Sequence, residues 1–119
     1  MKAEERAAQI WSVLALASRN RQELTYKIVG SLTGLPPYGL GRNLELIQSY
    51  CLIHQLPALT VLAVDESGIP GPGFTAAEDL PAERQRVFSY DWLAHGAPRP
   101  AEFAQATKQR PSNGDHRRA

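Results

Sequence analysis

The first stretch of the chain alternates apolar and polar residues with the period of an amphipathic helix. Its apolar positions recur three and four residues apart, which places them on one helical face: Ala7, Ile10, Trp11, Leu14 and Ala17. Acidic Glu4 and Glu5 near the start and basic Arg19 near the end suit the dipole of a helix. The pattern therefore predicts a helix from about Ala3 to Arg19.

Two further helices are predicted around a proline turn. Thr25 can cap a short helix over the apolar segment that follows, and Gly34 can supply the left-handed residue that ends it. Pro36 and Pro37 then force an extended turn, because a proline pushes the residue before it out of the helical region. A third helix is predicted over residues 38–54, from Tyr38 to about His54.

The third helix has one apolar face and one polar face. Spacings of four, three and four residues bring its apolar side chains together: Leu40, Leu44, Ile47 and Cys51. Its polar side chains are expected to face outward: Arg42, Asn43, Glu45, Gln48 and Ser49. Arg42 and Asn43 on such a face are suitable contacts for base edges or phosphates.

The segment after the third helix predicts one strand and one more helix. Residues 59–65 are short, apolar and β-prone, so they are expected to form a buried strand. Residues 66–68 signal a turn, and the proline-rich residues 69–74 must be irregular, because proline cannot donate to a β-ladder. With Pro81 in its first turn, a fourth helix is expected over residues 79–94.

The chain loses its apolar content after His95. This predicts a folded domain over residues 1–95 and a flexible, disordered basic tail over residues 96–119, with a helical turn at most around Phe103. The order of the elements predicts an α+β fold. We expect a mainly helical winged helix-turn-helix domain with a small β-hairpin, an additional C-terminal helix and a disordered tail.

Composition fits one such domain and narrows what it can bind. The chain has 119 residues and a formal net charge of +1, so bulk positive charge cannot hold nucleic acid or a membrane. The charge is unevenly distributed along the chain. Residues 19–43 hold four basic residues and one acidic residue, and residues 97–119 hold five basic and two acidic residues. Residues 65–91, by contrast, hold two basic and six acidic residues. Local charge therefore still permits a small nucleic-acid footprint on one face.

The cysteine content and the N-terminus exclude several classes of protein. A single cysteine, Cys51, excludes an internal disulfide and a four-cysteine zinc site. Cys51 and His54 have half the spacing of a zinc site without a second pair, so we expect no metal and no cofactor. The first residues lack the apolar stretch of a signal peptide, and no window approaches the roughly 20 apolar residues of a membrane span. We expect a soluble, cytoplasmic protein with no membrane partner.

A series of short motifs lies between residues 10 and 74. The motifs are Ile10-Trp11, Thr25-Tyr26, Gly34-Leu35-Pro36, Leu40-Gly41-Arg42, Leu56-Pro57, and Val64-Asp65 with Gly68 and Gly71. In order and spacing they resemble the C-terminal DNA-binding domain of the alkylguanine-DNA alkyltransferases and their alkyltransferase-like relatives. The resemblance covers about half of the chain and implies a winged-helix fold that binds DNA.

The chain departs from this family at the position of its catalytic cysteine. The family's Pro-Cys-His-Arg sequence matches Pro57-Ala58-Leu59-Thr60 here. Alkyl transfer needs a thiolate that a histidine-led proton relay activates. Ala58 supplies no nucleophile and Leu59 no base, and Cys51 lies on the apolar face of the third helix, where an inert thiol is expected. The resemblance therefore implies a DNA-binding protein that is not an enzyme.

The resemblance also implies a role for Tyr26, which matches the family tyrosine that helps to rotate a nucleotide out of the stack. The family's arginine finger aligns near Tyr38 or Leu40, so Arg42, a turn further on, is out of register. Base extrusion costs roughly a few kcal/mol and needs a pocket to offset it. Because the chain has neither a clear arginine finger nor the cysteine and histidine of the family's pocket, the resemblance does not extend to base flipping.

We expect the chain to bind double-stranded DNA, either intact or modified and distorted. The expected contacts carry positive charge, hydrogen-bonding groups or an aromatic ring, and most lie around the turn and the third helix. They are Tyr26, Lys27, Tyr38, Arg42, Asn43, Arg19 and Arg21.

The alternative hypothesis is a protein-interaction module, such as an adaptor, an inhibitor or an immunity-type partner. Residues 71–92 combine aromatic rings with a strongly acidic stretch that suits a basic partner such as a nuclease. The expected partner-binding residues are Phe74, Glu78, Asp79, Phe88, Tyr90, Asp91 and Trp92. The acids Glu78, Asp79 and Glu83 are also expected to cap a helix rather than to form a catalytic pair.

Overall fold

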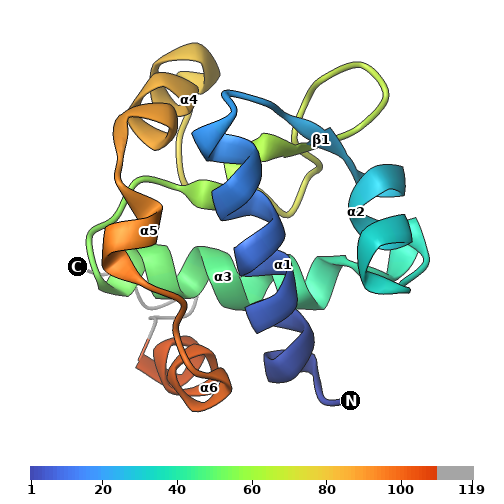
Figure 1. The fold of residues 1–119 in the computed structure, drawn as a ribbon, viewed down its shortest axis with the longest axis vertical. Coiled ribbons are helices and arrows are strands. Elements are labelled where there is room, and N and C mark those ends of the chain that lie inside the picture. Colours follow the sequence, from blue (N-terminus) through green and yellow to red (C-terminus); the bar gives the residue numbers. More distant parts are fainter. Residues whose placement is uncertain (110–119) are drawn as a thin grey trace.

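A computed structural model describes residues 1–109, which form a mainly helical α+β domain with one short sheet (Figure 1). The elements follow in the order α1 (Ala3–Arg19), β1 (Leu24–Thr25), α2 (Tyr26–Thr33), η1 (Pro37–Gly39), α3 (Gly41–Ile53), η2 (Leu59–Leu62), β2 (Ala63–Val64), α4 (Leu80–Ser89), α5 (Trp92–His95) and α6 (Pro100–Gln109). Within this described part of the chain, no helix is long and apolar enough to cross a membrane.

Three helices enclose the centre of the core. α1 lies across α3, and α6 packs against both of them (Figure 1). The rings of Trp11, Tyr50 and Phe103, one from each helix, meet there with centroids 5.3 to 5.9 Å apart. All three side chains are buried. Since aromatic pairs bury large areas and favour tilted or edge-on contacts, this cluster fixes the three helices relative to one another.

The sequence predicted the first two helices correctly. α1 has the predicted bounds, and its apolar positions are buried. The hydroxyl of Thr25 accepts a hydrogen bond from the backbone N–H of Ile28 at 3.2 Å and so caps α2. Gly34 ends α2 in the left-handed region with φ +77°, as predicted, and its N–H donates to the Gly30 carbonyl.

The predicted strand over residues 59–65 and the β-hairpin are wrong. Residues Leu59–Leu62 form the 3₁₀ segment η2, and β2 is only two residues long. β2 pairs with β1 in parallel, not with a following strand; the register joins Leu24 to Ala63 and Thr25 to Val64. Pro70 and Pro72 follow the predicted turn at once and cannot donate to a ladder. Residues 1–109 therefore contain a small parallel pair where a winged helix has a hairpin.

The predicted fourth helix is two helices. The chain becomes extended at Tyr90, and the carboxylate of Asp91 accepts a hydrogen bond from the Ala94 N–H at 3.0 Å. This cap starts α5 and ends the helical run that the sequence pattern had joined. The break turns Trp92 into the core, where its indole N–H donates to the Val87 carbonyl at 2.9 Å.

The predicted flexible tail is wrong for residues 96–109, because α6 belongs to the folded domain. Phe103 and Ala106 are buried on its inner face, the first of them against Trp11 and Tyr50. Its other residues are polar, alanine or proline, so the composition of α6 is typical of a solvated tail even though its inner face is apolar. The remainder of the predicted tail, residues 110–119, lies outside the described residues.

Candidate functional site

A pocket of about 290 Å³ opens beside the start of α3. Its walls come from the start of α2, the η1 turn, the first half of α3, η2 and the loop over residues 71–74. The lining is mainly apolar: Tyr26, Pro37, Tyr38, Leu40, Gly41, Leu44, Glu45, Gln48, Thr60, Gly71, Pro72, Gly73 and Phe74. A concave apolar pocket with a few polar groups is the usual form of a site for a small organic group.

Side-chain hydrogen bonds hold the loop that forms one wall of this pocket. The phenol oxygen of Tyr26 accepts a hydrogen bond from the Gly71 N–H. Gln48 donates through Nε2 to the Gly73 carbonyl at 3.1 Å, and its Oε1 accepts from the Thr75 N–H at 2.8 Å. Both side chains belong to helices that pack on the core, so the wall is set before any ligand arrives.

One of the residues that line the pocket, Thr60, carries a buried polar atom without a partner. Thr60 lines the pocket and is 5% exposed. Among residues 1–109, its hydroxyl oxygen is the one buried side-chain N or O atom with no hydrogen-bond partner. A buried hydroxyl without a hydrogen bond destabilises a protein by roughly 1–3 kcal/mol. A ligand that forms a hydrogen bond with Thr60 would remove this cost.

Exposed Tyr38 lines the pocket, and two exposed basic residues, Arg42 and Lys27, each follow a lining residue in the sequence. Tyr38 is 91% exposed, and Arg42 is exposed with its guanidinium 3.8 Å from the Glu45 carboxylate. Lys27 is exposed in the first turn of α2, next to Tyr26. No side chain caps the N-terminus of α3, which begins at Gly41. Free N–H groups at a helix N-terminus favour an anion there.

The prediction that the polar face of residues 38–54 points outward is correct for Arg42 and Glu45 but wrong for Asn43, Gln48 and Ser49. Asn43 is 5% exposed, and its Nδ2 donates to the Ala3 carbonyl at 3.1 Å. Gln48 and Ser49 are also buried. Since α1 and α6 both pack on α3, Asn43 is a structural residue and not a surface contact. Gly41, Leu44, Glu45 and Gln48 are the residues of α3 that line the pocket.

Arg19 and Arg21 do not join the other predicted DNA contacts. They line a second cavity, with Phe88, Tyr90 and other residues of α4 and α5. Tyr26 and Tyr38 line the first pocket, and neither contributes to the second. The structure therefore divides the predicted contacts between two places.

The predicted protein-binding surface is also divided. Phe74 lines the first pocket, whereas Phe88, Tyr90, Asp91 and Trp92 line the second cavity. Trp92 is 3% exposed, so its selection as a partner contact is wrong: it is a core residue. The remaining two acids, Glu78 and Asp79, are exposed, and Asp79 caps α4 by accepting from the Ala82 N–H at 3.1 Å.

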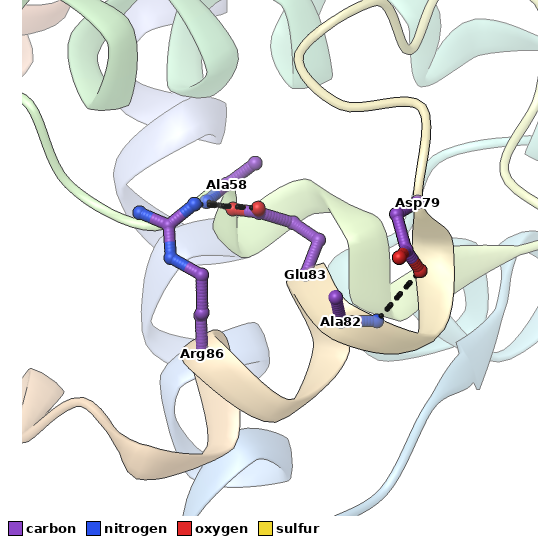
Figure 2. A network of polar contacts seen from close by, with 5 residues as sticks. All are labelled: Ala58, Asp79, Ala82, Glu83 and Arg86. Carbon is purple, nitrogen blue, oxygen red and sulfur yellow. Dashed lines mark hydrogen bonds and ion pairs between the residues drawn. The ribbon is translucent and has the colours of Figure 1, made fainter.

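Glu83 is a buried carboxylate and does not cap a helix (Figure 2). Its Oε2 accepts a hydrogen bond from the backbone N–H of Ala58 at 2.7 Å, and its Oε1 accepts from Arg86 Nη1 at 2.8 Å. Charge-assisted hydrogen bonds of this kind are stronger than neutral ones. Glu83 therefore fixes the backbone at the start of η2. This segment contains Thr60, one of the residues that line the pocket.

The single thiol is buried and unsuited to nucleophilic chemistry. The pKa of Cys51 is raised from 9.0 to about 12, chiefly by burial and to a smaller extent by the Glu83 carboxylate, against a hydrogen bond from the Leu59 backbone that lowers it. Only the thiolate is nucleophilic, so the thiol is inert near neutral pH. Because this pKa is raised on folding, burial of the thiol favours the folded state below pH 9, and that contribution is lost as the pH rises towards 12.

We expect the folded chain to resist thiol reagents. Three pKa units correspond to about a thousandfold less thiolate, so labelling of Cys51 at pH 8 should be about a thousandfold slower in native protein than in denaturant. Mass spectrometry of a timed labelling reaction measures both rates, with Cys51→Ala as the unlabelled control. Labelling of native protein at the denatured rate would contradict an inert thiol.

Residues 1–109 hold no group of three or more His, Cys, Asp or Glu side chains arranged to bind a metal ion. Comparison with protein-family models, with curated proteins and with solved structures finds no match to the chain. The pocket beside α3 and the charges around it are therefore the features from which a function has to be inferred.

Proposed function

We propose that the chain is a non-catalytic, cytoplasmic DNA-binding module that holds one unstacked base in the pocket beside Tyr26. One observation carries this proposal: a preformed apolar pocket with an unpaired hydroxyl lies directly next to an uncapped helix N-terminus and an exposed arginine. The pocket suits a flat ring, and the charged rim suits the phosphate attached to it.

The rim supplies the contacts that a DNA backbone needs. No side chain caps the start of α3, so its first N–H groups can bind one phosphate, and Arg42 is the second residue of that helix. Exposed Tyr38 offers a ring on which a neighbouring base can stack. Because few basic side chains take part, the protein should contact only a short stretch of DNA, and binding should depend on the pocket as well as on charge.

The pocket supplies the interactions that offset the cost of unstacking a base. Its walls include the side chains of Tyr26, Leu44 and Phe74, which bury a flat ring. The Thr60 hydroxyl both donates and accepts, so a rotation about its side-chain torsion allows a hydrogen bond to a base edge. An already unpaired or bulged base costs least to extrude, so distorted DNA is the expected target.

The sequence motifs agree with this proposal. They resemble an alkyltransferase-like DNA-binding domain, in which the tyrosine that matches Tyr26 helps to rotate a nucleotide. The same motifs place Ala58 where that family has its nucleophile, and Cys51 is buried and inert. Recognition without alkyl transfer is therefore the activity we propose.

Replacing Arg42 with alanine should weaken binding to a duplex with one bulged base by about threefold to tenfold at low salt. The loss of one phosphate contact should also reduce the slope of log affinity against log salt by about 1. Fluorescence anisotropy at several salt concentrations measures both quantities. Lys108→Ala, which removes the same charge from the exposed face of α6, is the control and should change neither.

Two results would overturn the proposal. Binding that is absent for perfect, mismatched, bulged and single-stranded DNA would exclude DNA as the ligand. Equal losses for the Arg42 and Lys108 variants would mean that bulk charge and not the rim of the pocket holds the DNA.

A protein partner is the second candidate, on a different surface from the one predicted. α2 exposes two aliphatic side chains four residues apart, Ile28 and Leu32, and Tyr38 is exposed nearby in the chain. Adjacent apolar groups on a short surface helix favour a protein interface. Co-purification of a stoichiometric protein without nucleic acid, lost on Leu32→Lys, would favour this candidate over DNA.

A further inference from the structure

The second cavity has a volume of about 280 Å³ and lies where the end of α1 meets α4 and α5. Its lining differs from that of the first pocket because it combines two arginines with aromatic rings. The lining residues are Ala15, Arg19, Arg21, Phe88, Ser89, Tyr90, Asp91, Trp92 and Leu93. The proposed DNA function assigns no role to this cavity.

The two arginines of this cavity differ from every other arginine of residues 1–109. That part of the chain holds seven arginines, and five of them reach a carboxylate or a backbone carbonyl: Arg6, Arg42, Arg84, Arg86 and Arg99. Among the described residues, Arg19 and Arg21 form no hydrogen bond or ion pair through their guanidinium groups. Two arginines that form no ion pair among the described residues therefore line one cavity.

Arg21 also has a backbone conformation that costs free energy. Its φ is +55°, in the left-handed region that follows many helices and that glycine adopts without strain. The Gln22 N–H donates to the Ala17 carbonyl at 2.9 Å, which completes this helix end around Arg21. The conformation holds the guanidinium 5.7 Å from the centre of the Phe88 ring. Gln55 ends α3 with a similar φ of +57°, so helix termination alone does not require an arginine at residue 21.

We infer that this cavity binds a phosphate group between Arg19 and Arg21. Two guanidinium forks match the oxygens of a phosphate, and two positive charges favour a dianion over a single carboxylate. The hydroxyl of Ser89 lines the same cavity and can donate a further hydrogen bond. Asp91 also lines it, so the lining carries one negative charge against the two positive charges of the arginines. The inference does not depend on the proposed DNA function.

Titration of ¹⁵N-labelled protein with inorganic phosphate tests this inference. The Nε–H signals of Arg19 and Arg21 and the amide of Ser89 should shift in a saturable way, with potassium chloride at equal ionic strength as the reference. Arg21→Gly should weaken phosphate binding at least about tenfold and keep the fold, because glycine suits a φ of +55°. Arg99→Ala, an equal loss of charge on the surface of another segment, is the matched control and should bind phosphate normally.

The same variants separate the two sources of phosphate. If the natural ligand is a DNA backbone, Arg21→Gly should also reduce the salt slope of duplex binding by about 1. If it is a free phosphate ester, duplex binding should stay unchanged while phosphate binding is lost; either result supports the site.

Three results would overturn the phosphate site: equal shifts with chloride, no shift at millimolar phosphate, or undiminished phosphate binding by folded Arg21→Gly. If Arg21→Gly loses phosphate binding but also has a lowered melting temperature, Arg21→Asn is measured as a second variant. Asparagine also tolerates this φ, and Arg21→Asn should lose phosphate binding too.

Discussion

Replacing Phe103 with alanine should lower the free energy of unfolding by about 3–5 kcal/mol, the range for truncating a fully buried phenylalanine. The side chain has no exposed surface and contacts the rings of Trp11 and Tyr50. Its removal leaves a cavity at the junction of α1, α3 and α6, where three rigid helices cannot close it easily. Denaturant titration followed by circular dichroism measures the change.

Gln105→Ala is the matched control for this prediction, because Gln105 lies on the same helix and is exposed. It should change stability by less than about 0.5 kcal/mol. A loss below about 1 kcal/mol for Phe103→Ala would contradict the packing of α6 on the core. It would instead support a folded domain that ends near residue 95, as the sequence alone suggested.

The sequence predicts the first half of the fold well because its helices obey simple local rules. α1 has a regular apolar face, and Thr25 and Gly34 start and end α2 by their own chemistry. These signals lie within a few residues of the structure that they determine. No knowledge of distant contacts is needed to interpret them.

The errors arise where a distant contact decides the local structure. Residues 59–62 are apolar and β-prone, but they are buried on all sides, and periodicity does not separate a strand from a 3₁₀ segment in that setting. Asp91 ends the fourth helix early because Trp92 then reaches the core. α6 has few apolar residues, and their value depends on the cleft that α1 and α3 offer to Phe103.

The candidate site was predicted only in part for the same reason. Tyr26, Tyr38 and Phe74 were named from the sequence, yet nothing local indicates that they line one pocket. Gln48 was expected on the surface, and its two hydrogen bonds reach residues 73 and 75, far along the chain. The unpaired hydroxyl of Thr60 depends on neighbours that only the folded chain supplies. Asn43 shows the converse error, since its exposure was inferred from a helical face that α1 covers.

Replacing Tyr26 with alanine should abolish most of the preference for an unstacked base. The change removes a ring from the pocket wall and the phenol oxygen that accepts from the Gly71 N–H. Loss of one aromatic contact to a base costs roughly 1–3 kcal/mol, which corresponds to about fivefold to 150-fold in affinity. Anisotropy titration with a bulged duplex measures this loss, and affinity for a fully paired duplex should change by less than about twofold.

Tyr26→Phe separates the two contributions of this residue. It keeps the ring but leaves the Gly71 N–H without its acceptor, so it should retain more of the base preference than alanine does. Equal losses for the bulged and the fully paired duplex on Tyr26→Ala would contradict a role for the pocket, because only the bulged duplex presents a base to it.

The central claim is that the pocket beside α3 receives a base from DNA. Its most direct test compares the affinity of the natural chain for two duplexes that differ in one group: a bulged nucleotide with its base, and the same bulge without it. Both duplexes carry the same phosphates, so electrostatic contacts cancel in the comparison. The duplex with the base should bind about fivefold to 150-fold more tightly, the range for one base stacked on an aromatic ring. Equal affinity for the two duplexes would contradict the claim.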